Sequence, residues 1–288
     1  MSGPWVQLPQ RVALTGAAGS LASDIIPALL ASGMELRCID RVRPERDFDV
    51  EWAVCDITDR PALSAALSGC DAVIHLAGIP LEDDWDRILK VNIDGTQAVL
   101  DCAQRLGITK AVLASSIHAA GFTPIPADGA RVPDETPVRP NTFYGVSKAA
   151  LEALGSYYHD RHGMDITCLR IASRFETPRD ARMLSTWLSP ADAGALFLQA
   201  LDKPSNGYRI VWGVSANTRS YLSAAGGTAI GYEPQDDAEL WAPDLVGPGA
   251  PETLQAADWD QQFIGGIFSS PFPPRHTPQQ STEIQETI

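Results

Sequence analysis

The sequence predicts an α/β protein, a doubly wound parallel sheet with helices on both faces. Three observations predict this class. Short apolar runs typical of strands alternate with longer segments of helical periodicity. The strand runs are almost continuously apolar, as expected for strands that are buried on both faces. A chain of 288 residues, 44% of them hydrophobic and 20% charged, has enough apolar material for such a core.

The expected elements follow one another along the chain. "RVALTG" predicts a first strand, and "SLASDIIPALLASG" predicts a first helix that closes on Gly33. The further strands that we expect are residues 35–40, 51–57, 71–78, 110–116, 165–173 and 208–213. The longer helices that we expect are residues 84–107, 144–163 and 189–201. After Ser173 the alternation loosens, and residues 275–288 have the composition of a mobile tail.

Charge and cysteine content argue against several classes of function. The formal net charge is −14 and the pI is near 4.7. This balance argues against nucleic acid or an anionic membrane as partner, because phosphate groups need a basic face. The five cysteines contain no CxxC pair, so we expect buried thiols rather than disulfides or a metal site. A basic leader and a membrane-length apolar run are both absent from the sequence, and we expect a protein of the reducing cytoplasm.

A glycine-rich turn joins the first strand to the first helix. "TGAAGSLA" places Gly16 and Gly19 directly before Ser20 and Leu21, which open the helix. Such a turn lets backbone N–H groups approach a pyrophosphate at the helix N-terminus, although glycines also close ordinary turns. Asp40 then ends the second strand, at the interval where a carboxylate meets the adenosine ribose diol of a dinucleotide. The pattern therefore predicts NAD as the cofactor.

Further candidate cofactor contacts follow the next strands. A carboxylate at Asp40 repels a 2′-phosphate and so favours NAD over NADP, but Arg41 and Arg43 come next and could serve that phosphate. Asp56 comes after the third strand, where it can reach the adenine amino group. The other residues that we expect near the cofactor, where strands end and small side chains let the backbone pass closely, are Ile57, Leu76, Ala77 and Gly78.

Three residues suggest proton transfer. "YGVSK" places Tyr144 and Lys148 four residues apart on one helix face, and Ser116 ends the fifth strand. The carboxyl ends of parallel strands are where such sheets bind ligands. A tyrosine with a pKa near 10 is a poor base at neutral pH, and a neighbouring lysine ammonium lowers that pKa. The alternative is that the helical pair merely decorates a surface helix.

With these residues the sequence resembles the extended branch of the short-chain dehydrogenase/reductase family. "TGAAGSLA", Asp40, "NIDGT" around Asn92, Ser116, "DETPVRP" and "YGVSK" carry the resemblance. It implies a Rossmann-type fold in which Tyr144 is the general base, supported by Lys148 and Ser116. It also implies cofactor contacts from Asn92, Tyr144, Lys148 and Ile171.

The later part of the chain is similar to the NAD-dependent uronate dehydrogenases, which oxidise C1 of a hexuronate to an aldarolactone. "RMLSTWLSPADAG", "GYEPQDDAE" and "FIGGIFSSP" carry this resemblance. It implies that Ser116, His118 and Ser173 contact the substrate, that Arg182 holds its C6 carboxylate, and that the protein is a homo-oligomer. Ile117 and Pro80 stand where that family has polar side chains, which removes two groups expected to meet sugar hydroxyls.

Residues 173–183, "SRFETPRDARM", gather Arg174, Arg179 and Arg182 in an acidic chain. We expect Arg182 alone of the three to bind substrate; a solvated loop paired with its own acids is the alternative. We further expect residues 1–173 to form the NAD-binding part and residues 174–274 a small substrate-binding region interleaved with it. An NAD-retaining epimerase or dehydratase of sugars or nucleotide sugars and a non-catalytic NAD-sensing protein remain as alternatives.

Overall fold

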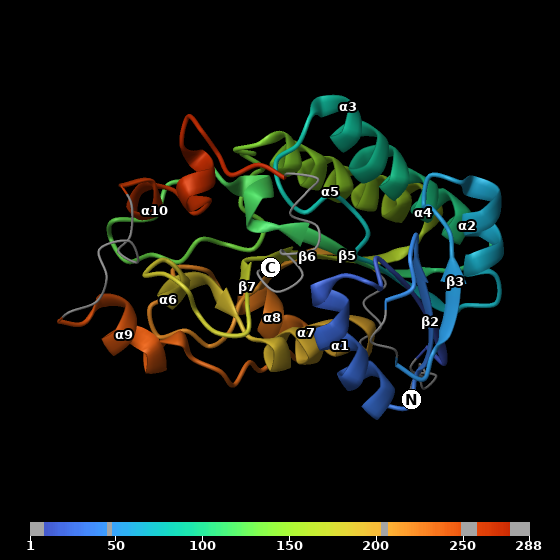
Figure 1. Ribbon diagram of the computed structural model, residues 1–288, viewed down its shortest axis with the longest axis horizontal. Coiled ribbons are helices and arrows are strands. Elements are labelled where there is room, and N and C mark those ends of the chain that lie inside the picture. Colours follow the sequence, from blue (N-terminus) through green and yellow to red (C-terminus); the bar gives the residue numbers. More distant parts are fainter. Residues whose placement is uncertain (1–8, 45–47, 203–206, 249–257, 277–288) are drawn as a thin grey trace.

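The computed structural model describes residues 9–44, 48–202, 207–248 and 258–276. A seven-stranded sheet of the predicted Rossmann type forms its centre, in the order β3-β2-β1-β4-β5-β6-β9, and every neighbouring pair is parallel (Figure 1). Its strands are β1 (Arg11–Thr15), β2 (Glu35–Asp40), β3 (Glu51–Val54), β4 (Ala72–His75), β5 (Lys110–Ser116), β6 (Asp165–Ile171) and β9 (Tyr208–Gly213). The chain order reverses between β1 and β4, and ligands bind at such a switch point in open α/β sheets.

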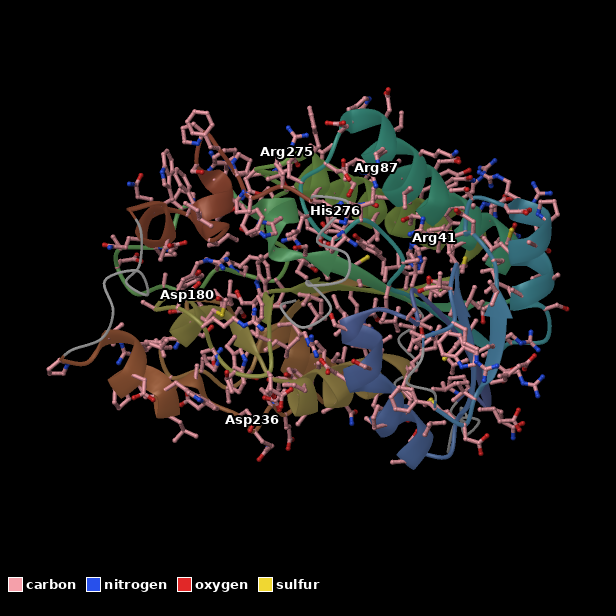
Figure 2. All side chains as sticks on the ribbon, in the orientation of Figure 1. Arg41, Arg87, Asp180, Asp236, Arg275 and His276 are labelled. Carbon is pink, nitrogen blue, oxygen red and sulfur yellow. The ribbon has the colours of Figure 1, made fainter. Side chains whose placement is uncertain are left out.

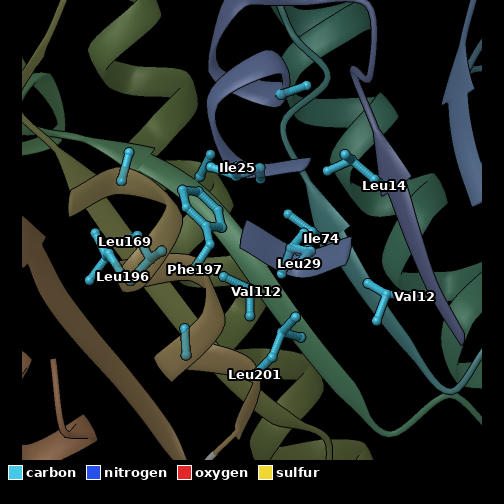
Figure 3. Close-up of a cluster of buried hydrophobic side chains, with 14 of the residues drawn as sticks. Val12, Leu14, Ile25, Leu29, Ile74, Val112, Leu169, Leu196, Phe197 and Leu201 are labelled. Atoms are coloured by element: carbon cyan, nitrogen blue, oxygen red, sulfur yellow. The ribbon is translucent and has the colours of Figure 1, made fainter. Parts of the chain in front are cut away.

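Helices cover both faces of this sheet. One layer consists of α1 (Ser20–Ala31), α7 (Pro190–Asp202) and α8 (Ala225–Ile230), and the other of α2 (Arg60–Leu67), α4 (Gly95–Arg105) and α5 (Phe143–His162). Successive side chains of β1 point to opposite faces. Val12 and Leu14 therefore belong to the apolar cluster on the side of α1 and α7, which also contains Phe197 (Figure 3). Ala13 belongs to the cluster of the other layer.

The segment expected as one helix over residues 84–107 is interrupted. It consists of α3 (Trp85–Ile88), a π-helical turn (Leu89–Asp94) and α4. The extra residue of a π turn redirects the side chains within it, and such turns often occur at functional sites. Here Asn92 lies inside the turn, where its amide accepts from the Ile79 N–H at 2.7 Å and donates to the Ile79 carbonyl at 3.0 Å.

Residues after Ser173 include elements that the sequence pattern did not predict. A small parallel sheet pairs β7 (Ser173–Arg174) with β8 (Trp187–Leu188). The short helices α6 (Met183–Thr186), α9 (Ala242–Val246) and α10 (Asp258–Gln262) complete this region. Since α7 and β9 return to the central sheet, the expected substrate-binding region is interwoven with the nucleotide-binding fold.

The expected mobile tail lies mostly outside the described residues, which end at His276. Its first two residues, Arg275 and His276, lie against residues 82–84, where Glu82 and Arg275 form a parallel β-bridge. Within the described part of the chain, no helix combines the length and apolar character needed to cross a membrane.

Candidate active site

A cavity of about 720 Å³ opens at the carboxyl ends of the central strands. All the residues predicted to bind cofactor or substrate line it, except Asn92. Asn92 is 3% exposed and lies behind the loop after β4, which it holds through Ile79. The Asn92 amide bonds to the backbone of Ile79 and to the Ser147 hydroxyl, so its direct contact with the cofactor stays a prediction.

The glycine turn has the geometry of a pyrophosphate cradle. Gly16 has φ +73°, and a Cβ there would lie 2.6 Å from the Ala77 backbone nitrogen, so only glycine fits. Helix α1 begins at Ser20, and no side chain caps its N-terminus at Gly19. Both Gly19 and Ser20 line the cavity. The uncapped helix end therefore presents its positive dipole to this space, which fits the diphosphate of NAD.

Two carboxylates lie beyond this turn on the cavity wall. Asp40 accepts hydrogen bonds from the backbone N–H of Ala18 at 3.0 Å and of Arg41 at 2.7 Å. These bonds fix the carboxylate beside the glycine turn, where a ribose diol would lie. In Asp56, a backbone hydrogen bond from Thr58 is the main cause of a lowered pKa, and the Thr58 hydroxyl adds to it. Arg41 also lines the cavity, and Figure 2 labels it at this end of the molecule.

Tyr144 and Lys148 extend from α5 toward the end of β5. The Lys148 ammonium donates to the Ala114 carbonyl at 2.7 Å and lies 5.5 Å from the centroid of the Tyr144 ring. Burial raises the pKa of Tyr144 to about 12, and a hydrogen bond with Ser116 opposes this rise. Burial also lowers the pKa of Lys148 to about 8, against the charges of Cys168 and Glu152. Lys148 is therefore still mostly an ammonium at neutral pH, as a group that stabilises a phenolate must be.

A buried ion pair between Glu152 and Arg170 lies next to Tyr144 and Lys148. Glu152, one turn after Lys148, accepts from Arg170 Nε at 2.8 Å and Arg170 Nη2 at 2.8 Å, and from the Ser115 hydroxyl at 2.6 Å. Arg170 is 1% exposed and also donates to the carbonyls of Asp134 and Thr136. Both charged groups of the pair thus have several hydrogen-bond partners, as a buried charge requires. The network ties β5, α5 and β6 together next to the predicted catalytic residues.

Arg182 occupies the opposite end of the cavity. Its Nη1 donates to the Ser173 hydroxyl at 3.1 Å and its Nη2 donates to the Ile264 carbonyl at 2.6 Å. Asp260 Oδ1 lies 3.9 Å from its Nε. Asp180 lines the same space, and burial raises its pKa, against a hydrogen bond from the Met183 backbone and the charge of Arg182. The guanidinium therefore faces the cavity between two carboxylates of the protein.

His118 lies between the two ends of the cavity. Its ring centroid is 4.4 Å from that of Phe268 and 5.9 Å from that of Tyr144. Burial, followed by the charge of Arg182, lowers the pKa of His118 to about 3, so the imidazole is neutral. A second histidine, His75 at the end of β4, is fully enclosed between the hydroxyls of Thr15 and Thr96. Burial lowers its pKa to about 3 as well, and because His75 does not line the cavity, we assign it to the fold.

The other arginines of the 173–183 loop have partners of their own. Arg174 forms an ion pair with Asp24 of α1, and the two side chains are 13% and 9% exposed. The Arg179 guanidinium lies over the Phe175 ring at 4.3 Å. Arg174 lines the cavity but Arg179 does not. Arg179 is thus outside the cavity, whereas Arg174 lines it but is paired with Asp24, an acid of α1 and not of its own loop.

Several cavity residues were missed by sequence reasoning. Ile267 and Phe268 belong to "FIGGIFSSP", which carried the resemblance but received no role. Asp260, Arg87 and His276 also line the cavity, and no local motif marks them. The two positions that depart from the uronate dehydrogenase pattern behave differently from each other. Pro80 lies exposed on the rim, while Ile117 is 2% exposed and joins a separate apolar cluster that also contains Trp212.

The sequence and the structure are both similar to those of known proteins. The NAD dependent epimerase/dehydratase family matches residues 12–224. A uronate dehydrogenase from Pseudomonas syringae pv. tomato is 33% identical over 268 residues, covering 91% of this chain and 94% of that protein. An NAD-dependent glucose-6-phosphate dehydrogenase from Haloferax volcanii is 38% identical over 255 residues, covering 80% and 95%.

A solved structure extends this similarity to the fold and the cofactor. It is a mutant uronate dehydrogenase from Agrobacterium tumefaciens complexed with NAD, with a TM-score of 0.81 at 31% identity, covering 93% of this chain and 99% of that one. The glycine turn, the uncapped helix and Asp40 fit the same cofactor. The chain belongs to the NAD-dependent epimerase/dehydratase family.

Proposed function

We propose that this protein is an NAD-dependent dehydrogenase that oxidises the C1 hydroxyl of a hexuronate to an aldarolactone. One observation carries the proposal: a single cavity joins the glycine turn, the Tyr144–Lys148 pair and Arg182. Similarity to uronate dehydrogenases over most of the chain supports the same substrate class.

The reaction needs a hydride acceptor and a base. Bound NAD supplies the acceptor at its nicotinamide C4. Tyr144 takes the proton of the C1 hydroxyl as the hydride leaves that carbon, so that a C=O bond replaces the C–H and O–H bonds. Burial raises the pKa of Tyr144 to about 12, so its phenolate form needs stabilisation. The Lys148 ammonium and the Ser116 hydroxyl stabilise the phenolate that does this work.

The other end of the cavity orients the sugar. Arg182 presents a planar guanidinium held by Ser173 and Ile264, and such a group can hold a carboxylate by two parallel hydrogen bonds. The neutral imidazole of His118 can donate to one sugar hydroxyl or accept from it. Fixing both ends of the substrate keeps C1 next to Tyr144, which is how orientation lowers a barrier.

A specific observation favours a second candidate, a neutral aldose. Asp180 and Asp260 both lie beside Arg182, so its charge is already countered by two carboxylates. Ile117 supplies no polar atom at the wall either. A sugar with a hydroxyl instead of a carboxylate at this end would meet less electrostatic repulsion.

The test is NADH formation with purified protein across hexuronates, neutral aldoses and hexose phosphates, with Tyr144→Phe as the matched inactive control. The proposal expects the highest kcat/KM with a hexuronate. Highest activity with a neutral aldose would replace it by the second candidate. Nicotinamide that stays bound through purification, together with interconversion of sugars and no net NADH, would indicate an epimerase or dehydratase. Absence of turnover with every sugar would favour the NAD-sensing alternative.

A further inference from the structure

The end of the described chain lies on the loop that follows β4. Arg275 pairs with Glu82 in a β-bridge, and the His276 N–H donates to the Glu82 carbonyl at 2.7 Å. The Arg275 guanidinium donates to Asp84 at 2.8 Å. These contacts join residues almost two hundred positions apart in the sequence. Figure 2 shows Arg87, Arg275 and His276 gathered on the side of the molecule where α3 and α5 lie.

The buried carboxylate of Asp83 lies close to both Arg87 and His276. The Asp83 side chain is 6% exposed. Its Oδ2 lies 2.7 Å from Arg87 Nη1 of α3 and 3.5 Å from His276 Nδ1. Both Arg87 and His276 line the cavity. His276 therefore forms part of the cavity wall, and it is fixed by the loop whose residues Pro80 and Leu81 also line the cavity.

Glu82 links this contact to the predicted base. Its Oε2 accepts from the Tyr144 backbone N–H at 3.0 Å, in the first turn of α5. Glu82 is 9% exposed, and a carboxylate at a helix N-terminus also interacts favourably with the helix dipole. One residue thus bonds to the catalytic helix through its side chain and to the C-terminal segment through its backbone.

We propose that Glu82 is a positioning residue for Tyr144, and that Arg275 and His276 act through Glu82 by holding the 82–84 loop in place. The proposal rests on the proposed function for the reaction that it affects. The residues expected to meet the diphosphate and the adenosine ribose, Gly16, Gly19 and Asp40, follow β1 and end β2, and no hydrogen bond joins them to Glu82 among the described contacts. Loss of the Glu82 contact is therefore expected to lower kcat much more than it weakens NAD binding.

The first test compares Glu82→Ala with Glu82→Gln in the full chain. Alanine removes the acceptor for the Tyr144 N–H, whereas glutamine keeps a side-chain oxygen there. One hydrogen bond contributes about 0.5–1.5 kcal/mol, which corresponds to about a 2- to 12-fold change. We expect Glu82→Ala to lower kcat by about that factor or more, with a much smaller change in the NAD dissociation constant, and Glu82→Gln to restore most of kcat. Equal kcat in wild type and Glu82→Ala, or equal losses in both variants, would overturn the proposal.

The second test addresses the C-terminal residues. His276→Pro removes the N–H that bonds to Glu82, while His276→Ala keeps it. We expect the proline variant to lose more kcat than the alanine variant. Arg275→Ala removes the ion pair with Asp84, and Arg219→Ala removes another surface ion pair, with Glu239, that does not involve the 82–84 loop, so only the former is expected to lower kcat. Identical kinetics for His276→Pro and wild type would show that the segment does not act through Glu82.

Hydrogen exchange separates this proposal from the proposed function. We expect the Tyr144 amide to exchange faster in Glu82→Ala and in His276→Pro than in Glu82→Gln, measured without any sugar. If the wild-type protein oxidises no sugar but the variants show this exchange pattern, the proposed function is refuted and the positioning contact stands. If the wild-type protein oxidises a hexuronate but the Tyr144 amide exchanges no faster in Glu82→Ala and His276→Pro, the positioning proposal is refuted and the proposed function stands.

Discussion

Replacing Arg182 by lysine keeps a positive charge but removes the guanidinium fork. In the structure that fork already uses Nη1 for Ser173 and Nη2 for the Ile264 carbonyl. A substrate carboxylate would use the remaining N–H groups of the same plane. A lysine ammonium is a point charge on a flexible stem and cannot hold the hydroxyl, the carbonyl and a carboxylate in this geometry. We therefore expect Arg182→Lys to lose most of the activity on a hexuronate.

The size of the loss follows from the bonds involved. A hydrogen bond to a charged group contributes about 1.5–3 kcal/mol. Loss of one such bond to the substrate corresponds to about a 10- to 150-fold fall in kcat/KM, and loss of a bidentate pair to more. Loss of the contacts to Ser173 and Ile264 affects every substrate equally, because those groups belong to the protein. The difference between two substrates therefore isolates the carboxylate.

The assay measures kcat/KM for a hexuronate and for the neutral aldose that differs only at C6. Arg179→Ala is the matched control, because Arg179 is exposed and does not line the cavity, although its guanidinium lies over Phe175, which does. Arg174→Ala does not serve, since it would leave Asp24 without its cation. Equal losses for the acid and the neutral sugar in Arg182→Lys would mean that Arg182 supports residues 264–266 and does not bind substrate.

Four further results are expected. Asp40→Ser should narrow the preference for NAD over NADP, and wild-type protein that uses both equally well would contradict the assignment of Asp40. Tyr144→Phe should lower kcat by about 10²-fold or more with NAD affinity unchanged; retention of more than about a tenth of kcat would rule out its role as base. Because burial lowers the pKa of Lys148 to about 8, kcat/KM should fall as the pH rises through that value, and a profile without an alkaline limb would count against an essential ammonium. Because the pKa of His75 falls from 6.5 to about 3 on folding, the unfolded chain binds the extra proton between these values. The free energy of unfolding should therefore decrease as the pH drops below 6.5, and less so in His75→Gln; equal slopes in urea titrations of both proteins would contradict this.

The sequence predicted features that depend on local pattern. The seven strands of the central sheet, the glycine turn at Gly16 and the pairing of Tyr144 with Lys148 each depend on neighbouring residues, and the structure places them as expected.

The features that the sequence could not predict depend on distant contacts. Arg182 finds its carbonyl partner at Ile264, and Arg174 finds its carboxylate at Asp24, both more than eighty residues away. Asn92 carries a familiar motif, but the π turn that directs it to Ile79 has no signal in hydrophobic periodicity. His276 belongs to a segment whose composition indicated a tail. Its place in the cavity follows only from the contacts that it and Arg275 make with Glu82.

The return of α7 and β9 to the central sheet has a consequence for biosynthesis. A ribosome releases residues 1–173 first, and they contain every element of the cofactor cradle. The part of α1 that packs on α7 nevertheless stays exposed to solvent until Phe197 and Leu201 emerge. Strand β6 likewise lacks its neighbour β9 until residue 213. Bare apolar surface and an unpaired strand edge are sites of aggregation. A chain that ends near Ser173 would therefore carry the whole dinucleotide motif next to an exposed apolar surface and an unpaired strand edge.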